Sequence, residues 1–197
     1  MTNALRLLSV NRALATPMLI NGQAVLTGIR KCAVDGPVAV RALGLEGDEQ
    51  ADPSVHGGLA KAVYAYPQAH YAFWQTVRAQ ARAAAPGEAL APGAMGENLT
   101  IEGLAEDRLW IGDRLLLPDC VLAVSEPRFP CFKFNATMGF NQAAKLMAQS
   151  GYCGSYLAVI TPGTVAAGQV IELAPGPREV NLRELFMARM AKAKVAG

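Results

Sequence analysis

Cys131 is the side chain in this sequence best suited to nucleophilic or metal chemistry, and it lies within the stretch SEPRFPCFKFN. Pro127 and Pro130 restrict the backbone around it, so we expect the sulfur to be presented rather than buried. Arg128 and Lys133 add positive charge on either side, which favours the thiolate, the form that attacks electrophiles and binds metals. The alternative is a core cysteine at a strand end, and these residues alone do not decide between the two.

A second cluster, VHGGLAK, has the residue types of an anion site. Gly57 and Gly58 allow the backbone to approach a ligand closely and leave N–H groups for an anion. His56 and Lys61 can add side-chain donors and positive charge, so the segment is typical of a phosphate or pyrophosphate site. The alternative for His56 is a loop histidine that hydrogen-bonds to the backbone.

Two smaller polar groups lie next to predicted strands. Glu97 could orient a ligand or a histidine, and the Asn98 amide could pair with the polar edge of a heterocycle. Arg30 and Lys31 follow another strand, and we expect at least one of them to reach a phosphate. The alternatives are an ordinary turn and a solvated basic pair. Asp48 and Asp52 are expected to organise the turn before the second cluster.

These residues must be positioned by short strands with a few helices between them. Asn21-Gly22 lies between two apolar runs and predicts a hairpin. A helix is predicted to begin at Pro67, because its fixed φ suits the first helical position. His70 lies on the apolar face of that helix, where we expect a structural role.

Strands are predicted again after a loop rich in Ala, Pro and Gly, over residues 97–101, 114–118, 121–126, 155–160 and 169–173. A short helix over 140–150 is predicted to end at Gly151. This order predicts a mainly β protein, a β-barrel with inserted helices, rather than a doubly wound fold. Residues 1–175 are expected to form the barrel domain, and 176–197 a C-terminal helix appendage capped by Asn181.

Composition excludes several classes of protein. The chain has 197 residues, 52% of them hydrophobic, and a net charge of +2, which gives no electrostatic footprint for nucleic acid. No apolar run reaches the roughly 18 residues of a membrane span, and Arg6 and Arg12 interrupt the N-terminus, which we interpret as a strand. The four cysteines include no Cys-x-x-Cys pair, which argues against zinc-ribbon and iron–sulfur sites. We expect reduced thiols and a cytoplasmic location.

The order of GLEGDEQAD, VHGG, PGAMGENLT, IGDRLLL, VSEPRFPCFKFN and GSYLAVITPGTVAAGQVIEL resembles the MOSC domain. This family is named for the C-terminal part of molybdenum-cofactor sulfurases. The resemblance spans Thr27–Leu173 and is strongest to the bacterial stand-alone type that reduces 6-N-hydroxylaminopurine. Each segment alone is weak, but the combination is highly specific. Such relatives often continue into a helical bundle, whereas this sequence predicts one helix after the barrel.

The resemblance implies a β-barrel that binds a molybdenum cofactor, a pyranopterin dithiolene carrying one phosphate, and it does not imply pyridoxal phosphate. Cys131 falls at the position of the family's cysteine, which implies a thiolate ligand to molybdenum. Soft thiolate suits a metal already held by sulfur. The expected cofactor site comprises Arg30, His56, Gly57, Gly58, Lys61, Glu97, Asn98 and Arg128.

The implied activity is a molybdenum-dependent reduction of N-hydroxylated compounds, R–NHOH to R–NH2 and water. No flavin or iron–sulfur signature is present, so a separate electron donor, a flavoprotein, is expected. Neither nucleic acid nor membrane is expected as a partner, and a homodimer is compatible with the sequence. One alternative is a non-enzymatic carrier of the cofactor, or of sulfur on Cys131. Another is a cysteine hydrolase that uses Cys131, His56 and Asn135.

Overall fold

A computed structural model describes residues 5–51 and 57–195. Its main sheet runs in the order β13-β9-β10-β11-β7-β8-β1-β4, and pairing of β1 with β13 closes it into a barrel. The barrel strands are β1 (Leu5–Arg12), β7 (Val63–Pro67), β8 (Leu99–Glu102), β9 (Arg114–Leu116), β10 (Val121–Pro127), β11 (Ser155–Thr161) and β13 (Val170–Ala174). All these pairings are antiparallel except β7 with β8.

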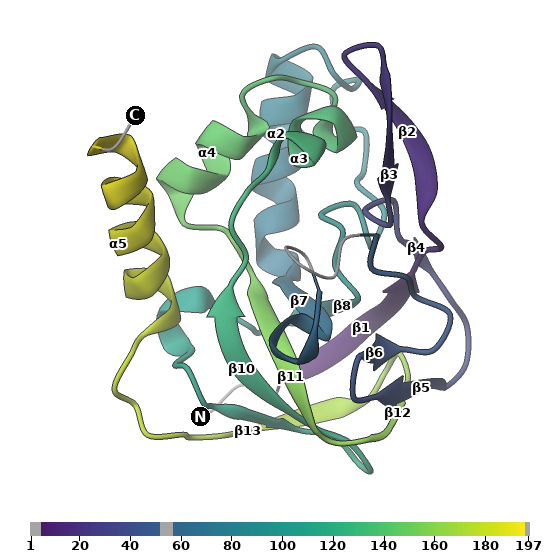
Figure 1. The fold of residues 1–197 in the computed structure, drawn as a ribbon, viewed down its shortest axis with the longest axis vertical. Helices are drawn as coiled ribbons and strands as arrows, with labels where there is room; N and C mark the ends of the chain where they lie inside the picture. The colour runs from purple at the N-terminus through teal and green to yellow at the C-terminus, as the bar shows by residue number, and fades with distance from the viewer. Residues whose placement is uncertain (1–4, 52–56, 196–197) are drawn as a thin grey trace.

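Smaller strands and the helices surround this barrel (Figure 1). The strands are β2 (Thr16–Ile20), β3 (Gln23–Thr27), β4 (Cys32–Ala33), β5 (Val38–Arg41), β6 (Gly44–Leu45) and β12 (Gly163–Val165). The helices are α2 (Tyr71–Gln80), α3 (Phe132–Met138), α4 (Ala143–Ser150) and α5 (Leu182–Val195), with short 3-10 turns η1 (Leu59–Lys61), η2 (Gln68–His70) and η3 (Glu106–Arg108). The expected mainly β barrel with inserted helices and a C-terminal helix is confirmed.

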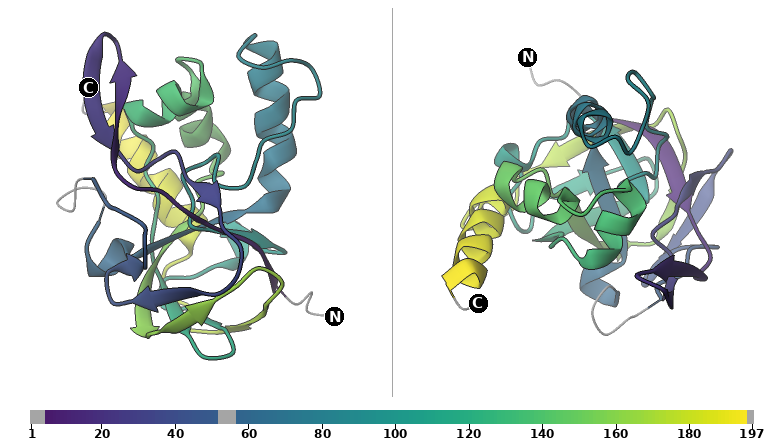
Figure 2. Two further views of the ribbon diagram at one scale, coloured as in Figure 1. Left: turned by 90° about the vertical axis from the view of Figure 1, so that its right-hand side faces the viewer. Right: turned by 90° about the horizontal axis from the view of Figure 1, so that it is seen from above.

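The helices and the β2–β3 hairpin gather at one end of the barrel. Figure 2 shows the hairpin and α2 rising on opposite sides of that end, with α3 and α4 between them. Among the described residues, no helix is long and apolar enough to cross a membrane. The arrangement leaves one end of the barrel framed by elements from distant parts of the sequence.

Two apolar clusters hold these parts together. The barrel interior is filled by fully buried aliphatic side chains, among them Leu7, Val63, Leu99, Leu122 and Leu157. The second cluster lies between the helices and the barrel end and is rich in aromatic and Met side chains, including Tyr66, Trp74, Phe134, Met147 and Phe186. Burial of such side chains supplies the main driving force for folding. Because Phe134 and Phe186 share this cluster, α3 and α5 pack against the same barrel end.

The structure confirms the predicted hairpin but not the predicted start of the first helix. Asn21 and Gly22 both have positive φ, 49° and 80°, so the predicted hairpin turn is confirmed. The predicted helix start at Pro67 is wrong: Pro67 is the last residue of β7, pairs with Ile101 in the parallel ladder, and has an extended ψ of 122°. Helix α2 begins only at Tyr71. A proline φ suits a strand end as well as a first helical turn.

The later helices and His70 agree with the sequence predictions, whereas one helix was not expected. The helix ending at Gly151 and the C-terminal helix are confirmed, and the Asn181 side chain caps α5 by accepting the N–H groups of Arg183 and Glu184. His70 is structural, as expected. Its Nε2 lies 2.7 Å from Glu106 Oε2, and its ring stacks on a tyrosine ring. Helix α3, however, is an element that the sequence did not predict.

Glu97, one of the expected cofactor-site residues, lies at the centre of a buried hydrogen-bond network and does not line the cavity described below. Its carboxylate accepts hydrogen bonds from the N–H groups of Gly93 and Met95 and from the hydroxyls of Tyr71 and Thr100. Burial raises the pKa of this carboxyl, while the hydrogen bonds act in the opposite direction. Glu97 therefore holds the loop that leads into β8.

Glu97→Gln should lower the free energy of unfolding by roughly 1–3 kcal/mol. Four donors converge on the Glu97 carboxylate. The NH2 group of a glutamine at this position would have to face one of these donors, which would then lose its acceptor. Urea denaturation measures the change. Glu102→Gln, at the exposed last residue of β8, is the matched control and should change stability little. Equal effects of the two substitutions would contradict a central role for the Glu97 network.

Candidate active site

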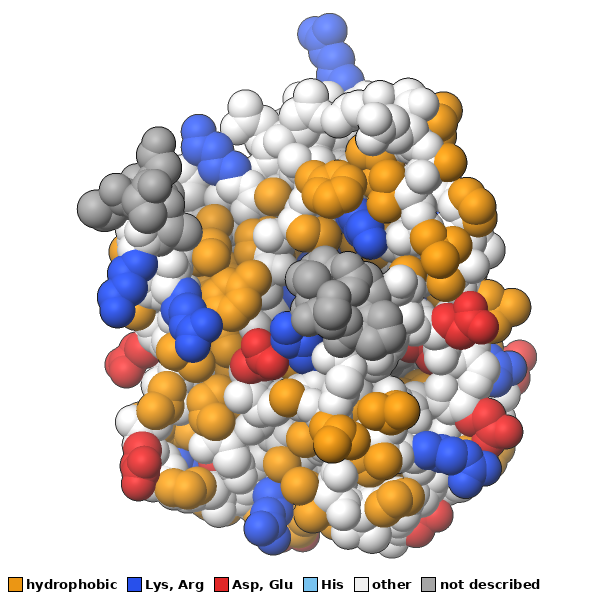
Figure 3. Space-filling model, viewed as in Figure 1, with side chains coloured by type: hydrophobic (Ala, Val, Ile, Leu, Met, Phe, Trp, Pro, Cys, Tyr) orange, Lys and Arg blue, Asp and Glu red, His pale blue; other side chains and the backbone are white. Residues whose placement is uncertain are grey.

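A cavity at the framed end of the barrel encloses about 640 Å³, counted out to its open mouth. It is lined by residues that follow β3 and β6, by η1 and the start of β7, by the loop before β8, by the segment after β10, and by Tyr156 of β11. A concave site lined by apolar side chains and a few convergent polar groups is the usual form of a small-molecule or cofactor site. Figure 3 shows Lys and Arg side chains on this face, among hydrophobic ones.

Cys131 is half-buried and contributes to the cavity lining. It follows β10 by a few residues and takes the N-cap position of α3, with an extended backbone at φ −130° and ψ 170°. The segment with Pro127 and Pro130 thus connects barrel strand β10 to helix α3, and residues of this connection line the cavity. The expectation that this sulfur is presented rather than packed into the core agrees with this position.

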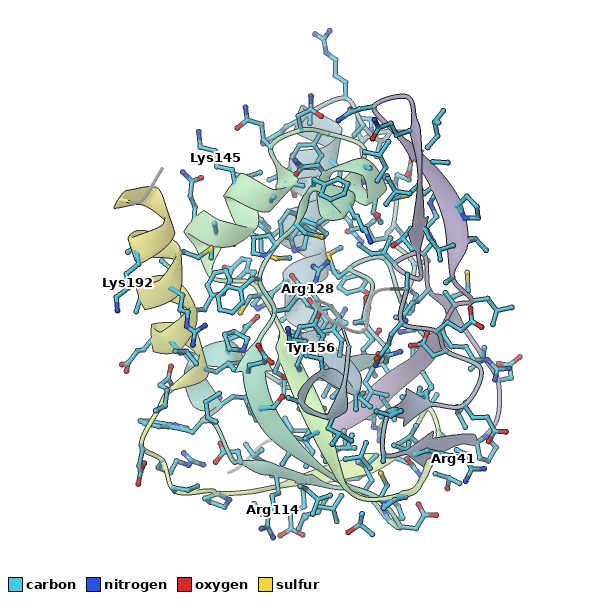
Figure 4. The ribbon with its side chains drawn as sticks, in the orientation of Figure 1. Arg41, Arg114, Arg128, Lys145, Tyr156 and Lys192 are labelled. Carbon is cyan, nitrogen blue, oxygen red and sulfur yellow. The ribbon has the colours of Figure 1, made fainter. Side chains whose placement is uncertain are left out.

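Arg128 is buried, at 6% exposed, and also lines the cavity. Its guanidinium carbon lies 5.2 Å from the centre of the Tyr64 ring and 5.0 Å from that of the Phe134 ring. Its Nη1 lies 3.9 Å from the Met147 sulfur. Figure 4 shows Arg128 beside Tyr156 near the centre of the molecule. The two rings hold the guanidinium in place through cation–π contacts.

No carboxylate pairs with Arg128 in the described part of the chain. Burial opposes its charge, whereas its interactions with the Tyr64, Tyr156 and Cys131 side chains favour that charge and hold the pKa of the guanidinium above its ordinary value. Burial also raises the pKa values of Tyr64 and Tyr156, which are therefore neutral phenols at pH 7. A buried cation is costly unless it is paired. The cavity therefore presents a fixed positive charge suited to an anionic ligand.

Two lysines of the cavity are more exposed than Arg128. Lys61 Nζ lies 5.9 Å from the centre of the Tyr156 ring and 4.0 Å from a Glu126 oxygen. Lys133 Nζ donates a hydrogen bond to the carbonyl of Leu26 at 3.2 Å, which ties α3 to the end of β3. Both lysines line the cavity and add to its positive charge.

A buried polar network fixes the floor of the cavity. Asp48 accepts hydrogen bonds from Lys31, from the Asn98 amide at 2.9 Å and from the N–H of Ala13 at 2.9 Å. Burial lowers the pKa of Lys31, and the Asp48 charge acts against that change. Asp48 thus organises this turn, as expected from the sequence.

Asn98 belongs to this network rather than to a recognition surface. Its amide donates to Asn11 O as well as to Asp48, and its Oδ1 accepts the N–H of Tyr64 at 3.0 Å. Both amide hydrogens are therefore used within the protein, although Asn98 lines the cavity. The expected pairing with a heterocycle edge is not supported, because no N–H remains to donate. Asn98 instead links β8 to β7 and to the turn at Asp48.

The structure brings together four of the expected site residues, Lys61, Asn98, Arg128 and Cys131. Arg30 is exposed outside the lining, and its neighbour Lys31 lines the cavity instead. Gly57 and Gly58 also lie outside the described lining, and the Gly58 N–H donates to Gln50 Oε1 at 3.0 Å. Asp52 and His56 lie outside the described residues.

Other expectations concern the remaining polar side chains. The Asn135 side chain accepts the N–H of Ala144 at 2.8 Å, so it links α3 to α4. Cys153 is fully buried, and burial raises the pKa of its thiol, as expected for a small apolar residue. Tyr64 and Tyr156 are lining residues that the sequence did not reveal, because tyrosines in apolar strands give no signal that separates a cavity from a core.

Comparisons with known proteins agree with this geometry. A family model described as "MOSC domain" matches residues 52–172. The chain is 37% identical over 158 residues to "Protein YiiM" of Escherichia coli (strain K12), an alignment that covers 80% of this chain and 68% of that protein. It is 38% identical over 175 residues to a "Reductase" of Gibberella moniliformis, covering 85% of this chain and 30% of that protein.

The fold is also similar to a solved structure. The crystal structure of YiiM from Geobacillus stearothermophilus has a TM-score of 0.74 and 28% sequence identity, covering 95% of this chain and 85% of that one. The family model spans the segments that carry Lys61, Asn98, Arg128 and Cys131. Sequence, fold and cavity thus agree, and the chain belongs to the MOSC-domain family.

Proposed function

We propose that this protein is a molybdenum-cofactor-dependent reductase of N-hydroxylated compounds such as N-hydroxylaminopurine bases. The observation that carries the proposal is the shared cavity of Cys131 and Arg128, a soft sulfur donor beside a buried cation that has no carboxylate partner among the described residues. Membership of the MOSC family and the relative named as a reductase support it.

The residues present fit the cofactor in three ways. Cys131 and Arg128 line the same cavity, so one ligand can reach both side chains. Arg128 and Lys61 offer positive charge for the cofactor's phosphate and dithiolene. Among the described residues, no group of three or more His, Cys, Asp or Glu could hold a metal ion alone. Cys131 would therefore add one ligand to a metal already held by the dithiolene.

Each lining residue then has a distinct part in the site. Cys131 would hold the molybdenum through its sulfur, and Arg128 would fix the anionic cofactor against the Tyr64 and Phe134 rings. Lys61 would bind negative charge near the mouth. When bound, the cofactor would supply the two-electron reduction that breaks the N–O bond of the substrate. The neutral phenol of Tyr156 lies within the same cavity and can offer a hydrogen bond to a polar ligand.

Cys131→Ser should abolish N-hydroxylaminopurine reduction while leaving the fold intact. Serine lacks the soft thiolate, but it is a favourable N-cap residue, so α3 should keep its stability. We would measure turnover with an artificial electron donor, molybdenum content and thermal unfolding. Cys32→Ser, at an exposed position on β4, is the matched control and should retain activity. Near-normal turnover by a fully loaded Cys131→Ser protein would refute the ligand role.

The same experiment separates the reductase from the alternative function. A carrier of cofactor or sulfur would bind pterin through this cavity but would show no turnover with any reductant. Wild-type protein that contains molybdenum and pterin, yet does not reduce the substrate with dithionite and methyl viologen, would favour the carrier.

Arg128→Met should lower pterin content without lowering the free energy of unfolding. Methionine can occupy the space between the two rings, and removal of a buried charge with no carboxylate partner in the described chain relieves its desolvation cost. Loss of one charge-assisted hydrogen bond to the cofactor should weaken its affinity roughly ten- to a hundredfold. Pterin fluorescence after oxidation and urea denaturation give the two values.

Arg78→Met is the control for this prediction. Arg78 binds the carbonyl of Met138 at 3.2 Å and pairs with Glu88, so its loss should reduce stability and leave pterin content per folded molecule unchanged. If Arg128→Met destabilises the protein as Arg78→Met does and keeps its pterin, then Arg128 is a structural cation, and its assignment to an anion site is wrong.

A further inference from the structure

We propose that the surface formed by α4 and α5 is the docking site for an acidic, flavin-bearing redox protein that delivers electrons to the cavity. The inference rests on the proposed reductase function, because it assigns the partner of that site. It concerns a face of the molecule separate from the cavity mouth, and it can be tested by binding as well as by turnover.

This surface carries an excess of positive charge. The described side chains of α4 and α5 include four exposed cations, Lys145, Arg183, Arg189 and Lys192, and one acidic residue, Glu184. Neither Lys145 nor Lys192 belongs to an ion pair with another described residue. In Figure 4 both point outward from their helices on the same side of the molecule. Figure 3 shows this side as a group of basic side chains beside hydrophobic ones.

The basic surface is connected to Cys131 by a short path through the protein. The guanidinium carbon of Arg189 lies 5.9 Å from the centre of the Phe129 ring, and that ring stacks on Phe186 of α5 at 5.7 Å. Phe129 is separated from Cys131 by one residue, so their Cα atoms are within about 7.6 Å of each other. An electron carrier docked on α4 and α5 would thus lie close to the cavity.

The chemistry of the proposed reaction defines the kind of partner. Each turnover converts R–NHOH to R–NH2 and water and consumes two electrons and two protons. Two encounters with a flavodoxin hydroquinone, each oxidised to the semiquinone, would provide the electrons, and solvent would provide the protons. A basic docking face favours an acidic partner, because complementary charges accelerate encounter and fix orientation.

The test compares two double charge reversals that change the net charge equally. Lys145→Glu/Lys192→Glu alters the proposed surface, whereas Arg41→Glu/Arg114→Glu alters exposed positions on other sides of the molecule (Figure 4). Reduced flavodoxin is the donor in stopped-flow assays, and dithionite with methyl viologen is the small-molecule donor. Carbodiimide cross-linking to flavodoxin reports binding and does not require the cofactor.

We expect the Lys145→Glu/Lys192→Glu protein to lose roughly tenfold or more of the flavodoxin-driven rate at low salt. Its cross-linking should also fall, and its rate with methyl viologen should not change. The Arg41→Glu/Arg114→Glu control should keep most of its flavodoxin-driven rate and most of its cross-linking. Equal losses in the two variants, or no loss in either, would overturn the docking site. Absence of turnover by the wild type with methyl viologen would instead count against the reductase, and cross-linking would still test the surface.

Discussion

A buried guanidinium that has no carboxylate partner among the described residues is the constraint on which the rest of this site depends. Removing a charge from water costs several kcal/mol unless another charge or a ligand compensates it. Arg128 is held between two aromatic rings, and its polar neighbours in the described chain are neutral phenols, the Met147 sulfur and the Cys131 sulfur. The aromatic cluster holds this arrangement in place, and it sets a positive charge in the cavity lining.

The barrel supplies the rigidity that this charge needs. The register of β10 and β11 places Glu126 opposite Tyr156, so Arg128 emerges beside the tyrosine that lines the cavity. Asp48 and Asn98 connect the first strand, the turn after β6, and strands β7 and β8 through buried hydrogen bonds. Buried networks of this kind, when fully satisfied, specify one arrangement. The cavity floor is therefore set before any ligand binds.

Much of this could be predicted from the sequence, and the failures have physical reasons. Short strands with glycine turns indicated the barrel, and Pro-Cys with flanking cations identified Cys131. The internal hydrogen bonds of Glu97 could not be predicted, because a carboxylate beside a strand looks the same in sequence whether its partners are ligands or backbone N–H groups. Arg30 was preferred to Lys31 because the sequence of this turn does not show which side chain points inward. The helix after Cys131 was missed because the prolines before it indicate a loop equally well.

The proposed role of the cavity is tested most directly by the metal and pterin content of the wild-type protein after purification from a host that makes the molybdenum cofactor. We expect the folded protein to contain molybdenum and pterin in equimolar amounts, and both should be lost together when the cofactor is released. Folded protein that contains neither, from a host whose other molybdenum enzymes are fully loaded, would contradict it.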